Sequence, residues 1–186
     1  VAVNTLAHGI EMEAKQRLDK VAWINAGFRA LCVNGPAGLK AEPLARELGV
    51  SKGSFYWHFA NLAAFREAMI DYWVAIATQG IIELVNSHSD DPVKRLEYLV
   101  LLSTEPPPEA VGGRGAEGAL RCWGRADAAV GKRLHAVDTA RIDYCAELFA
   151  AHGLKQEQAR LHGRLLYAAL IGLEQLDLAE LASLRR

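Results

Sequence analysis

Residues 44–59, LARELGVSKGSFYWHF, contain two short helical segments separated by a turn. The first segment has apolar residues at helical spacing, and Gly49 then suits the left-handed position that follows many helix ends. Ser51 is a typical N-cap residue for a second helix over residues 52–58. Two short helices joined by a turn that contains glycine pack at a steep angle. The stretch therefore predicts a helix-turn-helix unit.

The two faces of the second predicted helix differ in chemistry. Phe55 and Phe59 are four residues apart, so their rings lie on one side, where we expect them to pack in the core with Leu44, Leu48 and Val50. The other sides carry hydrogen-bond donors, aromatic rings and a glycine that adds no bulk. A short helix with donors at its positive N-terminus fits the DNA major groove. The predicted DNA contacts are Ser51, Lys52, Gly53, Ser54, Tyr56, Trp57 and His58.

Other interpretations of these residues stay open. Ser51 is expected to cap the helix and also to meet a phosphate. Trp57 suits either a base or sugar contact or a filler between domains. His58 suits a phosphate contact better than a metal ligand, because no second ligand has suitable spacing, and no metal or cofactor is expected.

Nearly all of the chain has the pattern of helices, so we predict an all-α fold. No pair of alternating segments with a hairpin turn signal is present. Asp91 and Pro92 form a typical helix start, and residues 104–113, TEPPPEAVGG, form the clearest loop. The helices are expected at residues 13–33, 41–48, 52–58, 61–76, from 91 onward, and at 115–124, 127–151 and 155–184.

Composition and charge bound the possible functions. The chain has 186 residues, of which 51% are hydrophobic and 23% are charged, so it can form one globular domain or two small ones. Residues 1–60 hold seven Lys/Arg and five Asp/Glu, a net charge of +2. Residues 61–186 hold fourteen and seventeen, a net charge of −3. The mild positive excess therefore lies with the helix-turn-helix.

The sequence predicts a cytoplasmic protein with no membrane partner. Cys32, Cys122 and Cys145 are odd in number and far apart, which excludes a disulfide framework or zinc spacing and fits a reducing compartment. The start, VAVNTLAHGIEME, lacks the basic region of a signal peptide. Residues 72–85, YWVAIATQGIIELV, are interrupted by Gln79 and Glu83 and fall short of the roughly 18 apolar residues of a membrane span.

Residues 20–65 resemble the TetR family of bacterial transcriptional regulators. The residues that carry the resemblance are Leu44-Ala45, Gly49-Val50-Ser51, Phe55, Tyr56, His58 and Phe59, in the order of the family signature. Beyond them, LRCWGRAD and DTARIDYCAELFAAHGL resemble the ligand and dimer domain of some members. The resemblance implies a three-helix DNA-binding head over residues 1–60, followed by a helical ligand-binding and dimerisation body over residues 61–186.

The resemblance also implies a function and an assembly. The protein is expected to be a ligand-responsive regulator, in the repressor role and not an enzyme, that binds a pseudo-palindromic operator as a homodimer and is released by a small molecule. Such members hold their ligand among the middle helices, so the expected pocket residues are Trp73, Tyr98, Trp123, Tyr144 and Tyr167, although core packing is the alternative. An apolar stripe on the last helix is expected at the dimer interface, with Leu161, Leu165, Ala168, Ala169, Gly172 and Leu176.

Two positions depart from the family pattern. Members often have Ser or Thr as the N-cap of the second helix, where this chain has Lys40, which could instead reach a phosphate. Members usually carry Lys or Arg early in the fourth helix, where this chain has Leu62. The missing basic residue favours weaker DNA binding.

Two other classes of function are left open. One is a small helical carrier protein with a vestigial head, which Leu62 and the low charge of the head favour. The other is an enzyme that uses His135, Asp138 and a nearby arginine, since these two residues are three apart on one helical face. Arg121, Arg125 and Arg141 could each hold an acid group of a ligand, but salt bridges are the more common role of such residues.

Overall fold

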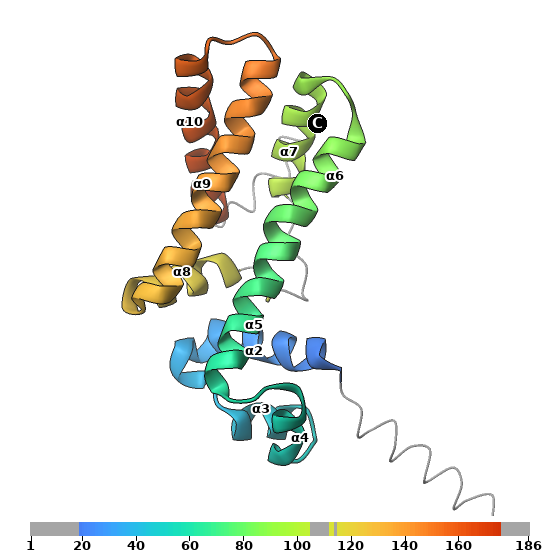
Figure 1. Ribbon diagram of the computed structural model, residues 1–186, viewed down its shortest axis with the longest axis vertical. Helices are drawn as coiled ribbons and strands as arrows, with labels where there is room; N and C mark the ends of the chain where they lie inside the picture. Colours follow the sequence, from blue (N-terminus) through green and yellow to red (C-terminus); the bar gives the residue numbers. More distant parts are fainter. Residues whose placement is uncertain (1–18, 105–111, 114, 176–186) are drawn as a thin grey trace, which may run out of the picture.

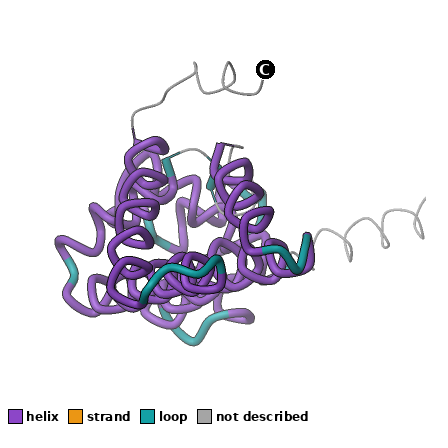
Figure 2. The backbone as a smooth tube through the Cα atoms, turned by 90° about the horizontal axis from the view of Figure 1, so that it is seen from above, coloured by secondary structure: helices purple, strands orange, loops and turns teal. Residues whose placement is uncertain are grey.

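The computed structural model describes residues 19–104, 112–113 and 115–175, and within these residues the chain consists of helices and loops. Figure 2 shows no strand in this described part, as the sequence predicts. The helices are α2 (Lys20–Asn34), the 3₁₀ turn η1 (Gly35–Gly38), α3 (Ala41–Glu47), α4 (Lys52–His58), α5 (Leu62–Val74), the π-helical turn η2 (Ala75–Gly80), α6 (Ile81–His88), α7 (Pro92–Thr104), α8 (Ala116–Ala126), α9 (Ala128–Ala151) and α10 (Gln156–Gln175).

The head contains α2, α3 and α4, at the lower end of Figure 1. Asp19 caps α2 through a hydrogen bond that its side chain accepts from the Val21 N–H, at 3.2 Å. Gly49 has φ 69°, the left-handed conformation expected between the two helices of the predicted motif. The prediction of a helix over residues 52–58 is confirmed by α4. Residues 13–18 of the first predicted helix lie outside the described residues.

One continuous helix connects the head to the far end of the body. It consists of α5, η2 and α6, and Figure 1 shows it running along the molecule from the head to the upper end; we call residues 62–88 the connecting helix. Asn61 caps it, accepting a hydrogen bond from the Ala64 N–H at 2.9 Å. The predicted end near Ile76 is wrong, because the π-helical turn continues the helix through Gly80.

The connecting helix is long and apolar enough to cross a membrane by length and composition alone. Residues 72–85 alone are too short for a membrane span, and joining them to residues 62–71 produces this length. In the structure, Phe65, Met69, Ile70 and Trp73 belong to the protein core. A core helix can pass the same test of length and composition, and 28% of the apolar window of this helix is buried inside the structure.

The body ends in an antiparallel pair of helices. Asp127 caps α9 by accepting hydrogen bonds from the N–H groups of Ala129 and Val130. Gly153, with φ 106°, turns the chain so that α10 runs back along α9. The structure confirms both the long helix that ends before Gly153 and the helix that follows it to residue 175. Residues 176–184 of the predicted last helix lie outside the described residues.

The hydrophobic core crosses the boundary predicted near residue 60. One cluster joins Trp23 and Phe55 of the head to Trp73 of the connecting helix and to Trp123 and Leu134 of the body. A second cluster, around Val85 and Tyr144, fills the upper end between α6, α7 and α9. A displacement of the connecting helix therefore acts on the packing of both the head and the body.

Candidate nucleic-acid interface

Phe55 packs α4, the second helix of the helix-turn-helix, against the core. Its side chain is fully buried, and its ring lies 5.2–5.3 Å, between centroids, from the rings of Trp23, Phe59 and Phe65. Phe59 is also buried. The two phenylalanines thus fix α4 by its inner face, as the sequence predicts, and a pair of edge-to-face rings adds about 0.5–1.5 kcal/mol beyond the buried area.

The opposite face of α4 is turned to solvent. Trp57 is 89% exposed and Tyr56 is 51% exposed. Lys52 and Gly53 are exposed, while Ser54 and His58 are half-buried. The structure therefore brings these predicted DNA contacts together on one outer surface of the head. An almost fully exposed tryptophan has no packing role in the described chain, which leaves its ring available to a partner.

The N-cap positions of α3 and α4 differ from the expectation. Ser51 precedes α4 in an extended conformation, but its side chain makes no capping hydrogen bond, so this part of the prediction is wrong. Lys40 holds the same position before α3 and also makes none. Both side chains are exposed. Because the Ser51 side chain does not cap α4, the first-turn N–H groups of α4 keep their positive partial charge.

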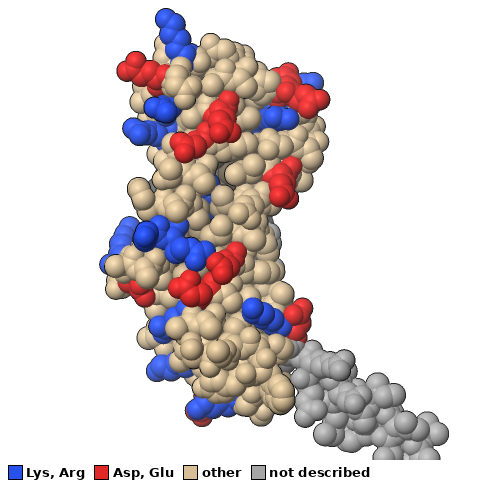
Figure 3. All heavy atoms as spheres, viewed as in Figure 1, with Lys and Arg blue, Asp and Glu red and all other residues tan. Residues whose placement is uncertain are grey.

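Some basic side chains of the head form ion pairs with acidic residues, and others do not. Arg29 pairs with Glu47 at 2.7 Å, and Arg46 pairs with Glu42 at 3.7 Å. No acidic side chain among the described residues pairs with Lys40 or Lys52. On the face drawn in Figure 3, the lower end, where α3 and α4 lie, shows Lys and Arg side chains separated by neutral surface.

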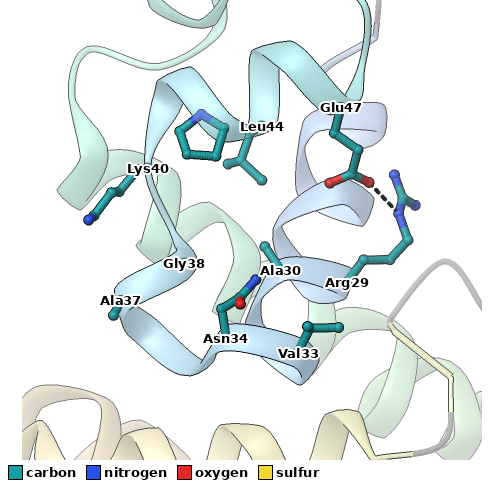
Figure 4. A pocket seen from close by; sticks show the side chains of 10 residues that line it. Arg29, Ala30, Val33, Asn34, Ala37, Gly38, Lys40, Leu44 and Glu47 are labelled. Carbon is teal, nitrogen blue, oxygen red and sulfur yellow. Dashed lines mark hydrogen bonds and ion pairs between the residues drawn. The ribbon is translucent and has the colours of Figure 1, made fainter.

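An open pocket of about 720 Å³ lies beside this surface, between α2, η1 and α3 (Figure 4). Lys40 stands at one side of it and the Arg29–Glu47 ion pair at the other. The other lining residues are Ala30, Val33, Asn34, Ala37, Gly38, Pro43 and Leu44. None of the five aromatic residues predicted to hold a ligand lines this pocket.

The five aromatic residues are divided among three parts of the body, with Trp73 and Trp123 in one cluster and Tyr98 and Tyr144 in another. Trp73 and Trp123 belong to the main core, and Tyr98 stacks on His88 with the ring centroids 3.8 Å apart. The hydroxyl of Tyr144 donates to Oδ1 of Asn86 at 2.9 Å. The fifth, Tyr167, belongs to a cluster of charged side chains that the sequence analysis did not identify as a unit.

This polar cluster joins three helices of the body, α8, α9 and α10. Arg121 donates to both carboxylate oxygens of Asp138, at 2.8 and 3.3 Å, and to the Tyr167 hydroxyl at 3.0 Å. Tyr167 donates to Oδ1 of Asp138 at 2.6 Å. Glu117, which is 6% exposed, accepts from Arg141 at 3.2 Å and lies 2.7 Å from Arg121 in an ion pair without hydrogen-bond geometry. Asp138 is therefore engaged within the protein and not paired with His135.

The contact between Arg121 and Asp138 favours the ionised form of both side chains. Burial alone would lower the pKa of Arg121, but the hydrogen bond that Arg121 donates to Asp138 and the charge of Glu117 outweigh it, so the pKa is raised. Burial would raise the pKa of Asp138, yet its hydrogen bonds with Arg121 and Tyr167 lower it. Burial raises the pKa of Tyr167 to about 12, so the hydroxyl stays protonated and donates. Two cations and two anions thus neutralise each other inside the body.

The predicted dimer residues of α10 lie on its outer side. Leu161 and Leu165 are 56% and 60% exposed, and Ala168 and Ala169 are also exposed. Gly172 has nothing within 4 Å of an added Cβ. Leu176 lies outside the described residues. The glycine that α10 uses for close packing is instead Gly163, which the sequence analysis did not name.

Leu62, which stands where a basic residue was expected, packs against the main core. Its side chain is half-buried at the first position of α5, next to the head. The position therefore contributes packing and no charge. Whether its lack of charge lowers DNA affinity stays a prediction.

Comparison with known proteins finds a family match over the helix-turn-helix and solved structures with a similar fold. Residues 24–69 match the family described as bacterial regulatory proteins, tetR family. No curated protein sequence matches the chain. A crystal structure from Rhodococcus sp., described as a TetR-family transcriptional regulator, superposes with a TM-score of 0.64 at 22% identity, covering 87% of this chain and 86% of the other.

Two further solved structures share the fold. E. coli NemR in its reduced form superposes with a TM-score of 0.64 at 18% identity, over 84% of this chain and 87% of that one. A Clostridium perfringens protein described as a fatty acid metabolism regulator superposes with a TM-score of 0.63 at 16% identity, over 86% of each chain. The matched segment contains α3, the turn and α4 with its buried Phe55 anchor. The chain thus shares the all-helical fold of these solved structures, and its residues 24–69 match the tetR-family model.

Proposed function

We propose that this protein is a transcriptional repressor that binds a pseudo-palindromic DNA operator as a homodimer and is released by a small molecule. The observation that carries the proposal is the solvent-facing side of α4, where Lys52, Tyr56 and Trp57 project from a helix whose other side is fixed by Phe55. A seven-residue helix of this kind fits the major groove, with its first turn toward the base edges. Lys40 and Lys52 would contact phosphates.

The proposed dimer rests on α10. Leu161 and Leu165 leave large apolar side chains in solvent on the outer side of the α9–α10 pair. Two such pairs related by a two-fold axis would bury these leucines in a four-helix bundle. Two heads related by the same axis would reach half-sites roughly 34–36 Å apart, in successive major grooves.

Release requires that ligand and DNA favour different head positions. A ligand that fits the body better when the heads are wrongly spaced must lower DNA affinity, and by linkage DNA must lower ligand affinity by the same factor. The connecting helix is the element that could carry this coupling, because it starts at the head and ends in the body. A regulator of this design needs no catalytic group.

The test is DNA binding by parent and variant proteins. Duplex fragments from the region upstream of the gene are incubated with the parent, and with Lys52→Ala. Lys155→Ala serves as the matched control, since this exposed lysine lies in the turn between α9 and α10, at the opposite end of the molecule. We expect Lys52→Ala to weaken binding and to reduce the salt slope by about one, and Lys155→Ala to do neither. Equal affinity and equal salt slope for Lys52→Ala and the parent would refute the site assignment.

Release is tested on the same complex. Apolar metabolites are added to the protein–duplex mixture, and loss of the slow-migrating complex is followed. A compound that dissociates the complex must itself bind less tightly when the duplex is present in excess. Absence of this reciprocity would show that the compound acts by another route.

A further inference from the structure

Arg141 of α9 holds the π-helical turn of the connecting helix. Its Nε donates to the hydroxyl of Thr78 at 3.0 Å, and its Nη2 donates to the backbone carbonyl of Ala77 at 3.1 Å. The guanidinium also lies over the ring of Trp73, 4.9 Å from the centroid. Three residues on consecutive turns of the connecting helix are therefore held by one side chain of another helix.

The turn that Arg141 holds is the irregular part of the connecting helix. Residues 75–80 form π-helix between two α-helical segments, and π-helical turns occur often at functional positions. A π-helical turn is also a place where a helix bends. Because Arg141 binds the Ala77 carbonyl and the Thr78 side chain at this point, its position affects the angle between α5, next to the head, and α6, in the body.

The other end of the guanidinium is fixed in the body. Nη1 of Arg141 donates to Glu117 of α8 at 3.2 Å and to the Tyr167 hydroxyl of α10 at 3.4 Å. The side chain of Arg141 is 15% exposed and that of Glu117 is 6% exposed. If Arg141 moved away, the buried carboxylate of Glu117 would lose a hydrogen-bond partner. Intermediate positions of Arg141 are therefore unfavourable, and two discrete arrangements are favoured over a gradual displacement.

A second link between α9 and the connecting helix differs from this one. Arg133 pairs with Glu67 and Asp71 on α5, but its side chain is 39% exposed and those of its partners are 56% and 64% exposed. Exposed ion pairs contribute little and are screened by salt. The buried contact at Arg141 is thus the stronger candidate for fixing the angle.

We propose that Arg141 is a positioning residue that fixes the bend of the connecting helix at η2 and thereby couples the arrangement of α8, α9 and α10 to the spacing of the two DNA-binding heads. This inference rests on the proposed function. A ligand bound in the body that shifts α8 or α10 would pull Glu117 or Tyr167, move Arg141, and release the Thr78 and Ala77 contacts. The head would then change its angle without any contact with the ligand.

The first experiment tests the contact in the free protein, without DNA or ligand. Thr78→Val removes the hydroxyl that accepts from Arg141 and keeps the side-chain shape, whereas Thr78→Ser restores a hydroxyl. Thr139→Val is the matched control, because within the described part of the chain Thr139 donates only to the His135 carbonyl of its own helix. Hydrogen–deuterium exchange is measured over residues 62–88. We expect Thr78→Val to speed exchange at residues 76–84 by roughly tenfold, the effect of one lost charge-assisted hydrogen bond.

Thr78→Ser and Thr139→Val are expected to exchange like the parent over the same residues. Unchanged exchange in Thr78→Val would overturn the proposal, because the contact would then not hold the turn. Faster exchange throughout the chain would also overturn it, since Thr78 would then support the fold in general rather than this turn.

The second experiment tests whether the effect reaches the heads. The parent selects a duplex from random sequences, and affinity is measured for that duplex and for a version with one half scrambled. If η2 is more flexible, more conformational entropy is lost when both heads of the dimer bind one DNA site together. The structure of each head stays unchanged. We expect Thr78→Val to bind the whole site several-fold more weakly and the half-scrambled site as the parent does, with Thr78→Ser restoring whole-site binding.

Any other result would contradict the proposed coupling between the bend at η2 and the spacing of the heads. Equal affinities of Thr78→Val and the parent for the whole site, despite faster exchange, would overturn it. An equal loss on both duplexes would overturn it too, because the damage would then lie in the head itself. If the parent selects no duplex at all, the proposed function fails and the coupling fails with it, while the exchange experiment still reports on the contact between Arg141 and Thr78.

Discussion

Gly163 of α10 lies directly against the backbone of Ala146 of α9. A Cβ added at Gly163 would come 2.7 Å from the amide nitrogen of Ala146 and 3.0 Å from both its Cα and its Cβ. Ala146 itself is buried. Helices α9 and α10 therefore touch backbone to backbone at one point, which only a residue without a side chain allows.

Substitution of Gly163 by alanine is expected to destabilise the protein. Alanine has the higher helix propensity, by about 1 kcal/mol, but here its methyl group would meet backbone atoms that cannot move aside. We expect a net loss of about 1–3 kcal/mol in the free energy of unfolding, measured by urea denaturation. Gly172→Ala is the control, because nothing lies within 4 Å of its Cβ position, and it is expected to stabilise the helix slightly. Equal stabilities of the two variants would contradict the close contact.

The two predicted N-caps of the head region should behave differently on substitution. Asn61 caps the connecting helix through its Oδ1, so Asn61→Ala should lower the free energy of unfolding by about 1 kcal/mol. Ser51 makes no capping bond, so Ser51→Ala should leave stability within a few tenths of a kcal/mol. If Ser51 contacts a phosphate, as proposed, Ser51→Ala should weaken DNA binding instead. Thermal unfolding and gel-shift titration of the two variants together separate the roles.

Local signals in the sequence were sufficient to predict the head. Phe55 and Phe59 are four residues apart, Gly49 has the left-handed conformation, and α4 covers the predicted residues. Caps at Asn61, Asp91 and Asp127 also form as single-residue chemistry dictates. Each of these features depends on neighbours within a few positions along the chain, which is why the sequence alone predicts them.

The polar cluster could not be predicted in the same way. Thr78, Glu117, Arg141 and Tyr167 come from four different helices, and no spacing along the chain relates them. A sequence pattern indicates that Arg121 and Arg141 lie on helices, but which side chains they meet depends on how α8, α9 and α10 pack. The π-helical turn was not predicted either, and its contact with Arg141 is to a residue 64 positions away from Ala77, which the local sequence does not reveal.

The exposed leucines of α10 lead to a prediction about assembly. Leu161→Glu combined with Leu165→Glu would place two like charges in the centre of the proposed four-helix interface, where burial of an unpaired charge is costly. We expect the parent to sediment as a dimer and the double variant as a folded monomer at the same concentration. Leu84→Glu, at a 43% exposed leucine of α6, is the control and should stay dimeric. A monomeric parent would contradict the proposed assembly.

Stability should fall at alkaline pH, in part through Tyr167. Burial and its surroundings raise the pKa of Tyr167 to about 12, whereas an unfolded tyrosine has a pKa of about 10. The contribution of Tyr167 to the free energy of unfolding is therefore fully present below about pH 10. It is lost as the pH rises toward 12, because the tyrosine of the unfolded chain ionises first. Burial raises the pKa of the Cys145 thiol to about 11 and that of Tyr144 as well, so both act with the same sign.

The experiment compares unfolding free energies of the parent and Tyr167→Phe across this pH range. At neutral pH the variant should be less stable by about 1–3 kcal/mol, because Arg121 and Asp138 lose a buried partner. Between about pH 10 and pH 12 its free energy of unfolding should decline less steeply, since one titrating group is gone. Two curves that stay parallel over the alkaline range would show that the Tyr167 hydroxyl titrates alike in the folded and unfolded chain, contrary to its place in the polar cluster.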